Sequence, residues 1–402
     1  MFFTIQPEPL DAYNTKMFNF TALPPLCLYI HIPWCVRKCP YCDFNSHATP
    51  DALPEKAYID ALFSDLEHDL PTIWGRPVHS IFIGGGTPSL FSAEAIDALL
   101  VGLRMRLQIS PFAEITLEAN PGTIETGRFS EFRAAGINRL SIGCQSFHDP
   151  QLERLGRIHT GREAILAAEA AHDAGFDNFN LDLMFGLPGQ TLQQAQADID
   201  QAIKLEPTHI SHYQLTIEPN TLYHHSPPVL PHDDTIWSMQ EAGEAQLEQA
   251  GYGHYEVSAH AQEGKQSQHN LNYWSFGDYL GIGAGAHAKI SSAADQSITR
   301  SWKQRHPQSY LDAPPGEHVS GSQVLSRHDA SFEFMLNALR LKQGFEKSLF
   351  TAHTGLPIHR IAAALQIAEQ KGLIKQDLSR ITPTRQGWHF LNELVGLFME
   401  DA

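Results

Sequence analysis

The chain lacks three features that would place it in common classes of protein. No stretch approaches the roughly 18 consecutive apolar residues of a membrane span, so the sequence predicts no transmembrane helix. Five cysteines in 402 residues are too few for a disulfide framework, which favours a reducing, cytoplasmic location. There is also no basic excess. The net charge of −17 disfavours general nucleic-acid binding, because attraction to phosphates needs a basic face.

Length and local composition predict how the chain is divided. The first 22 residues contain no basic region followed by a long apolar core, so we expect no cleaved signal peptide. A Pro/Gly/Ser-rich stretch after residue 312 predicts a linker, and the acidic excess lies before it. We therefore expect four parts: an N-terminal extension (1–25), a main domain (26–312), a linker (313–324) and a C-terminal domain (325–402).

The main domain alternates short apolar runs with amphipathic segments. The predicted strands are 26–32, 78–83, 114–119, 138–143, 178–184 and 210–217. The predicted helices between them are 54–70, 93–107, 126–135, 162–174 and 192–205. Six β/α units in series predict a parallel sheet, and six rather than eight units predict a partial, open (β/α)6 barrel. Functional residues are then expected at the C-terminal ends of the strands.

The C-terminal domain has a different pattern. Two helical segments precede a short strand pair near 372–384, and a further helix follows near 388–399. This order predicts an α+β, winged-helix-like domain. Because the domain is nearly neutral, a packing or partner-binding role is favoured over DNA binding.

Three of the five cysteines are clustered after the first predicted strand. Cys35, Cys39 and Cys42 form a C-x3-C-x2-C motif on one short loop. Three thiolates can bind three irons of a [4Fe–4S] cluster and leave the fourth iron open for a substrate or cofactor. A zinc site that also uses His31 or His47 is the alternative, although zinc normally takes four ligands in paired sets.

The cysteine spacing, with Tyr41 just before the third cysteine, resembles the radical S-adenosylmethionine (SAM) superfamily. The resemblance implies that the open iron binds the amino and carboxylate groups of SAM, and that the reduced cluster cleaves SAM to a 5′-deoxyadenosyl radical. Gly84, Gly85 and Gly86 follow the second strand and match the glycine-rich motif of that superfamily. Such glycines let the backbone approach a ligand closely. The partial barrel is also the architecture of this superfamily.

Polar residues at the later strand ends suit a SAM-like ligand. The Glu118 carboxylate could bind a ribose hydroxyl or an ammonium, and the Gln145 amide could both donate to and accept from ribose. Arg157 could pair with a carboxylate, and Asp182 is costly to bury without a partner. Each residue alone is equally consistent with an ion pair, a helix cap or a satisfied core group.

Five longer segments resemble the oxygen-independent coproporphyrinogen III oxidase-like family within this superfamily. They are 29–35, 82–89, 118–121, 143–147 and 182–191. By position, the resemblance implies a SAM site lined by Tyr29, Tyr41, Gly85, Gly86, Thr87, Glu118, Gln145, Arg157, Asp182 and Thr216. It also implies a [4Fe–4S] cluster held by Cys35, Cys39 and Cys42.

Two features are more similar to the haem chaperone branch of that family than to its oxidases. The oxidases have a fourth cysteine two places after the third, where this chain has Phe44. The run from His269 to Trp274 is HNxxYW, which resembles the haem-binding signature of the chaperones. A neutral imidazole is a good axial ligand for haem iron, and Tyr273 and Trp274 offer flat apolar faces. The alternative is that His269, one of 22 histidines, is an ordinary core or surface residue.

The resemblance implies a cytoplasmic radical SAM haem chaperone connected with porphyrin biosynthesis. It would bind haem and pass it to haem-dependent proteins, membrane-bound respiratory subunits included, and receive electrons from a flavodoxin or ferredoxin. One rival function is anaerobic oxidative decarboxylation of coproporphyrinogen III. The other is a radical SAM alkyl or methyl transferase. Whether the protein is an enzyme therefore stays open at this point.

Overall fold

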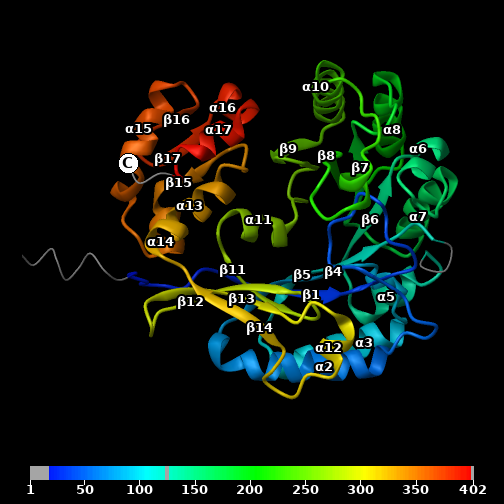
Figure 1. Ribbon diagram of the computed structural model, residues 1–402, viewed down its shortest axis with the longest axis horizontal. Helices are drawn as coiled ribbons and strands as arrows, with labels where there is room; N and C mark the ends of the chain where they lie inside the picture. Colours follow the sequence, from blue (N-terminus) through cyan, green and yellow to red (C-terminus); the bar gives the residue numbers. More distant parts are fainter. Residues whose placement is uncertain (1–17, 123–125, 400–402) are drawn as a thin grey trace, which may run out of the picture.

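The computed structural model describes residues 18–122 and 126–399, so most of the predicted N-terminal extension lies outside the described residues (Figure 1). Its centre is a sheet with strand order β14-β13-β12-β11-β1-β4-β5-β6-β7-β8-β10-β9. Six strands in the middle, from β1 to β8, are mutually parallel and lie in chain order. This confirms the predicted series of β/α units.

The six strands and their helices lie close to the predicted positions. The strands are β1 (Leu26–Ile32), β4 (Val78–Gly85), β5 (Ile109–Ala119), β6 (Arg139–Gln145), β7 (Phe179–Phe185) and β8 (His209–Gln214). The helices between them are α2 (Glu55–Asp69), α3 (Ala93–Arg106), α5 (Phe129–Ala135), α7 (Gly161–Asp173) and α8 (Leu192–Lys204). The strands are almost continuously apolar because parallel strands are covered on both faces. Capping boxes at Thr160 and Thr191 fix where α7 and α8 begin.

The sheet continues beyond the six predicted strands at both edges. At one edge β11 (Asp278–Ile282) pairs in parallel with β1, and β12 (His287–Ser292), β13 (Ser297–Lys303) and β14 (Val319–Val324) follow in antiparallel order. At the other edge β10 (Ala259–Ala261) and β9 (Gly253–Glu256) follow β8. Half of the predicted linker is therefore a strand, since β14 spans residues 319–324.

Shorter elements join these strands. They are β2 (Trp34–Cys35), β3 (His47–Ala48), η1 (Leu70–Ile73), η2 (Pro88–Leu90), α6 (Asp149–Arg154), α9 (Leu222–His225), α10 (Asp233–Gln249), α11 (Gln268–Trp274) and α12 (Pro307–Leu311). In Figure 1, α11 lies above the centre of the sheet, between the helices of the barrel and the C-terminal domain. Within the described ranges, none of the helices is long and apolar enough to cross a bilayer.

The C-terminal domain has its own apolar core. Its elements are α13 (Arg327–Ala338), β15 (Phe345–Glu346), α14 (Lys347–Thr354), η3 (Ile358–Ile361), α15 (Ala362–Gln370), β16 (Ile374–Gln376), β17 (Arg380–Pro383), α16 (Arg385–His389) and α17 (Leu391–Gly396). Helices around a small three-stranded sheet confirm the predicted α+β class. Phe18 and Phe20, just before the barrel, pack into this same core, so the N-terminal segment joins the two parts.

Candidate functional site

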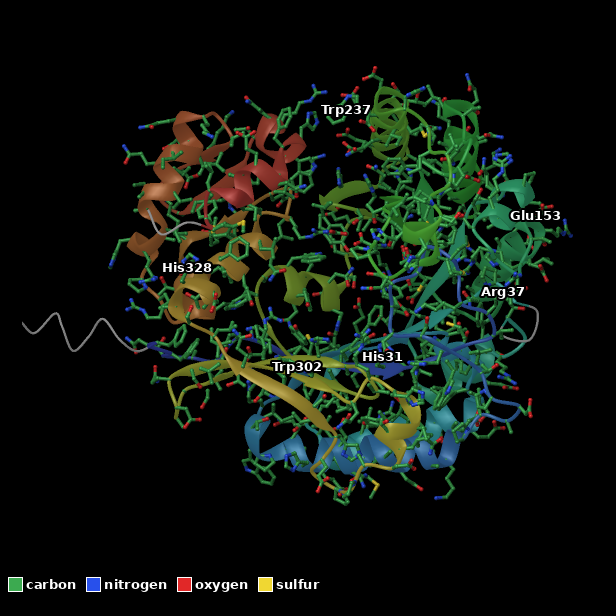
Figure 2. All side chains as sticks on the ribbon, viewed as in Figure 1. His31, Arg37, Glu153, Trp237, Trp302 and His328 are labelled. Carbon is green, nitrogen blue, oxygen red and sulfur yellow. The ribbon has the colours of Figure 1, made fainter. Side chains whose placement is uncertain are left out.

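The three clustered cysteines lie on the loop between β1 and α2, and all three are half-buried at the wall of one cavity. Each sulfur has a polar neighbour. Thr87 Oγ1 lies 3.5 Å from Cys35 Sγ, Arg157 Nη1 lies 3.8 Å from Cys39 Sγ, and Ser46 Oγ lies 4.0 Å from Cys42 Sγ. Burial raises the pKa of the Cys35 and Cys42 thiols. Exposed, charged Arg37 marks the outer side of this loop in Figure 2.

The cavity beside the cysteines has a volume of about 340 Å³ and lies at the C-terminal ends of β4 to β8. This is the lower part of the range typical of small-ligand sites. It brings together most of the predicted SAM residues: Tyr41, Gly85, Gly86, Thr87, Glu118, Gln145, Arg157, Asp182 and Thr216. We call it the cluster cavity.

Glycine is required where β4 enters the cluster cavity. Gly85 has φ +117°, and a Cβ there would lie 2.6 Å from the His31 ring. A Cβ on Gly86 would lie 2.4 Å from the carbonyl oxygen of Trp34. The end of β4 therefore packs directly against β1 and the residue after it against β2, and only glycine permits this approach.

Two of the carboxylates that face the cluster cavity, Glu118 on β5 and Asp182 on β7, are enclosed by the strands and have no ion-pair partner among the described residues. The pKa of Glu118 is raised to about 7, chiefly by burial and also by the nearby Asp182 carboxylate, while the hydrogen bond from the Gly85 amide opposes the shift. Burial also raises the pKa of Asp182, whose hydrogen-bond partners among the described residues are the neutral side chains of Asn180, Ser211 and Ser141. Two enclosed carboxylates held by neutral donors suit a cationic ligand, because a cation would offset the cost of their burial.

The guanidinium of Arg157 faces the same cavity from the loop after α6. Arg157 Nη2 donates to Asn120 Oδ1 and to the Gly143 carbonyl oxygen, each at 2.7 Å, and its buried Nε has no hydrogen-bond partner in the described part of the chain. The cavity therefore offers both signs of charge, as a zwitterion with an additional positive charge requires. SAM has this chemistry, so the residues present fit the ligand.

Gln145 ends β6 in an uncommon backbone conformation. Its φ is +68°, and its Oε1 atom accepts a 2.7 Å hydrogen bond from the Tyr213 hydroxyl. A non-glycine residue in the left-handed region is strained, and such strain is often found where a side chain must be aimed at a ligand. Sequence reasoning missed Tyr213 and Asn120 as cavity residues: Asn120 directly follows a predicted strand, but Tyr213 lies inside the strand predicted at 210–217, which in the structure ends at Gln214.

A second cavity of about 710 Å³ adjoins the first. Gly85, Glu118, Asp43 and Phe44 line both. Its other walls are largely aromatic: Tyr29, His31, Phe82, His269, Tyr273, Tyr279, His287 and Trp302. We call it the aromatic cavity. Tyr29, predicted for the SAM site, therefore lies here, where its hydroxyl is 3.0 Å from His31 Nδ1.

His269 enters the aromatic cavity from α11. The Glu114 carboxylate accepts the amides of Gln268 and His269 and so fixes the N-terminus of this helix. The Nδ1 atom of His269 lies 3.0 Å from Ser80 Oγ. Burial lowers the pKa of His269 to about 3, so the imidazole is neutral at neutral pH. A neutral, oriented imidazole in an apolar cavity can serve as an axial metal ligand.

The two aromatic residues of the HNxxYW run, Tyr273 and Trp274, point in different directions. Tyr273 lines the aromatic cavity and stacks with Tyr279 at a ring separation of 4.8 Å. Trp274 lines neither cavity and instead packs against the Arg340 guanidinium, 4.4 Å from its ring centre. The structure therefore places His269 and Tyr273 together, and Trp274 at the contact with the C-terminal domain.

The remaining cysteines lie in the core. Cys27 on β1 and Cys144 on β6 are buried, and burial raises the pKa of the Cys27 thiol to about 11 and that of Cys144 further. Among residues 18–122 and 126–399, no three His, Cys, Asp or Glu side chains converge as ligands of one metal ion.

Comparison with known families identifies two regions of the chain. Residues 29–202 match the radical SAM superfamily, and residues 325–390 match the HemN C-terminal domain. The first region contains the cysteine loop, part of β1, and the strands β4, β5, β6 and β7. The second contains most of the C-terminal domain.

Several curated relatives match along almost their whole length, and they share one name. Heme chaperone HemW of Escherichia coli (strain K12) is 50% identical over 379 residues, which is 94% of this chain and 99% of that protein. Heme chaperone HemW of Haemophilus influenzae is 50% identical with the same coverage. Heme chaperone HemW of Bacillus subtilis is 34% identical, covering 92% of this chain and 98% of that protein.

Among solved structures, coproporphyrinogen III oxidase (HemN) from Escherichia coli has the same fold. Its TM-score is 0.78 at 24% identity, and the match covers 94% of this chain and 90% of that one. The HemN-like fold includes the central sheet and the C-terminal domain together. At 24% identity this similarity shows that the two proteins share a fold, and it shows nothing about a shared activity.

Proposed function

We propose that this chain, which belongs to the HemW family of the radical SAM superfamily, is a haem chaperone that binds haem and transfers it to haem-dependent proteins. The relatives named above support this function over almost the full length of the chain. The observation that carries the proposal is the neutral imidazole of His269, directed into a large aromatic cavity.

The superfamily implies a [4Fe–4S] cluster and SAM, and the cluster cavity fits both. Cys35, Cys39 and Cys42 would hold the cluster, whose reduced form supplies an electron to SAM. Arg157 would bind the carboxylate of SAM, and Glu118 and Asp182 would face its positive groups. Gly85 and Gly86 would let the backbone contact it, with Tyr41, Thr87, Gln145 and Thr216 around it. Tyr29 lines the aromatic cavity and would be separated from SAM by the wall formed by Gly85 and Glu118.

Haem would occupy the aromatic cavity. His269 would be its axial ligand, with Ser80 holding the other ring nitrogen, and Tyr273 would contact the macrocycle. Trp274 would contribute by anchoring α11 to the C-terminal domain through Arg340. The cavity volume of about 710 Å³ is within the usual range for sites that hold molecules of this size.

We place this function in the cytoplasm, where low-potential iron–sulfur chemistry and free thiols persist. The proposed recipients are haem-dependent proteins, membrane-bound respiratory subunits among them. The proposed electron donor is a flavodoxin or ferredoxin. The acidic balance of the chain, −17 overall, gives no support to nucleic-acid partners.

The test is anaerobic reconstitution followed by parallel assays with haem and with coproporphyrinogen III. We expect stoichiometric haem binding, seen by absorbance, and no decarboxylated product. His269→Ala should weaken haem binding while leaving iron content and SAM binding unchanged. Robust decarboxylation would overturn the chaperone in favour of the oxidase, which the comparisons do not favour. If His269→Ala binds haem as tightly as the parent protein, His269 is not the axial ligand.

A further inference from the structure

Opposite α11, the aromatic cavity has a second wall that no recognised motif covers. It consists of the paired strands β12 and β13 with the residues just after β13. We infer that this wall is the face on which the tetrapyrrole is recognised, and that Arg305 binds one of its carboxylates. The inference rests on the proposed function and deepens it, since it names how the chain distinguishes a carboxylate-bearing macrocycle from other flat apolar ligands.

The aromatic part of the wall is built by one cross-strand pair. His287 on β12 is directly opposite Trp302 on β13, their rings are 6.4 Å apart, and both line the cavity. The back of the indole packs on Gly321 of β14, where an added Cβ would lie 2.4 Å from the ring. The glycine therefore makes room for Trp302 and supports it. In Figure 2, Trp302 and His31 lie on the sheet on the side where α11 is placed.

The basic part of the wall is Arg305. Three other cations on β12 and β13 are already paired: Lys289 with Asp278, Arg300 with Glu333, and Lys303 with Asp65 and Asp69. Among the described residues, the exposed Arg305 guanidinium has no such carboxylate, although it lines the cavity. Its backbone is held in place, because the Arg305 carbonyl oxygen accepts from Asn45 Nδ2 at 2.8 Å. A guanidinium presents a planar fork that matches a carboxylate.

Charge also sets which way the ligand lies. The border with the cluster cavity has the carboxylates of Glu118 and Asp43. A ligand carboxylate would be repelled by these two carboxylates and attracted to the Arg305 guanidinium. Haem is a flat apolar macrocycle with two carboxylates on one edge. Its iron would face His269 while its carboxylate edge points to Arg305.

The test compares two probes, haem and haem dimethyl ester, on anaerobically reconstituted full-length protein. Arg305→Ala should weaken haem binding about tenfold and leave binding of the ester unchanged, because the ester has no carboxylate to lose. Arg305→Glu should weaken haem binding further. Arg162→Ala is the matched control, since Arg162 is an exposed arginine on α7 that lines neither cavity. It should change neither probe. The absorbance of bound haem should stay the same in every variant, since His269 is untouched.

The outcomes separate the inference from the function on which it rests. If Arg305→Ala binds haem as tightly as the parent protein, or loses haem and ester equally, Arg305 does not recognise a carboxylate and the inference is overturned. In that case haem binding that still depends on His269 would leave the chaperone function standing. If the parent protein binds neither probe, both the function and the inference fail.

Discussion

The backbone amide of Gly85 donates a 3.0 Å hydrogen bond to Glu118 Oε2, and these two residues line both cavities. They form part of the wall between the cluster cavity and the aromatic cavity. The charge on Glu118 is therefore felt on both sides. A cation in the cluster cavity favours the ionised form, and an apolar ligand in the aromatic cavity favours the neutral form. This gives the two sites a shared ionisable group.

The first prediction concerns the pH dependence of Glu118. Its pKa is raised from 4.5 to about 7, so it stabilises the fold below about pH 4.5, and this contribution is lost as the pH rises through about 7. Glu118→Gln has no side chain that ionises, so it should not lose stability as the pH rises through about 7. The variant should be more stable than the parent at pH 8, by on the order of 3 kcal/mol at most, and little different at pH 5. Chemical denaturation of cluster-free protein measures both values.

The same group makes SAM binding depend on pH. SAM is cationic, so it should bind more tightly at pH 8 than at pH 6 in the parent protein, and this difference should shrink in Glu118→Gln. Asp182→Asn serves as a comparison, because its carboxylate faces the same cavity. Parallel pH profiles in parent and Glu118→Gln proteins would contradict the assignment of the raised pKa to this residue.

The second prediction concerns the cluster ligands. Cys39→Ser should abolish the iron and the visible absorbance of the reconstituted protein, because Cys39 is one of three sulfurs facing the cluster cavity. Cys144→Ala should leave both unchanged, since that thiol is fully buried at the end of β6. Equal iron loss in the two variants would rule out a three-cysteine site.

The third prediction concerns Arg157. Arg157→Ala should weaken SAM binding by roughly 2 kcal/mol, as expected for a charge-assisted hydrogen bond. Iron content is the internal control, because the guanidinium is also 3.8 Å from Cys39 Sγ. A variant that loses iron and SAM binding together would show that Arg157 acts on the cluster loop. A variant that keeps both would show that another group binds the carboxylate.

Much of the barrel was predictable from local pattern. The first strand occupies residues 26–32 as predicted, because seven residues buried on both faces form an uninterrupted apolar run. The edges of the sheet were not predicted. Leu26 pairs with Asp278, about 250 residues away, and no local period reports such a contact. β14 shows little burial, so its sequence resembles that of a linker.

The candidate site shows the same division. Residues at strand ends come together because parallel strands bring their C-terminal ends to one edge. Which residues of the HNxxYW run face the aromatic cavity could be seen only once the structure showed that the run forms a helix. In α11, Tyr273 is four residues after His269 and shares its face, whereas Trp274 is five residues after it and does not. The haem-binding roles of the residues in α11 and the SAM-binding roles of the residues in the cluster cavity stay predictions.

The fourth prediction concerns Ser80, whose hydroxyl contacts the ring nitrogen Nδ1 of His269. Ser80→Ala removes the hydroxyl 3.0 Å from Nδ1, so the imidazole loses the group that fixes its orientation. Haem affinity should fall about tenfold, the usual effect of removing such a supporting hydrogen bond. His269→Ala should cost more and should change the absorbance spectrum of bound haem. Identical spectra and affinities in Ser80→Ala and the parent would show that Ser80 has no orienting role.

The last prediction concerns Asn45, which ties the cluster loop to the far wall of the aromatic cavity. Its Nδ2 donates to the carbonyl oxygens of Ala284 and Arg305 at 2.9 and 2.8 Å, and its own carbonyl oxygen is 2.8 Å from His31 Nε2. Asn45→Ala removes these two side-chain bonds to the backbone and a third bond, between Asn45 Oδ1 and His47 Nε2 at 3.3 Å. Unlike His269→Ala, it should lower cluster occupancy and haem affinity together, because it loosens a loop that lines both cavities.

Asn138→Ala is the matched control for this coupling. Asn138 also makes two side-chain bonds to the backbone, accepting from the Ile115 amide at 2.7 Å and donating to the Ala113 carbonyl oxygen at 2.8 Å. It precedes β6 at the opposite end of the strands. Both variants should lose about 1–3 kcal/mol of stability, but only Asn45→Ala should affect iron content and haem titration. If Asn45→Ala loses haem affinity with full iron content, the cluster loop and the haem wall are independent, and the coupling through Asn45 is disproved.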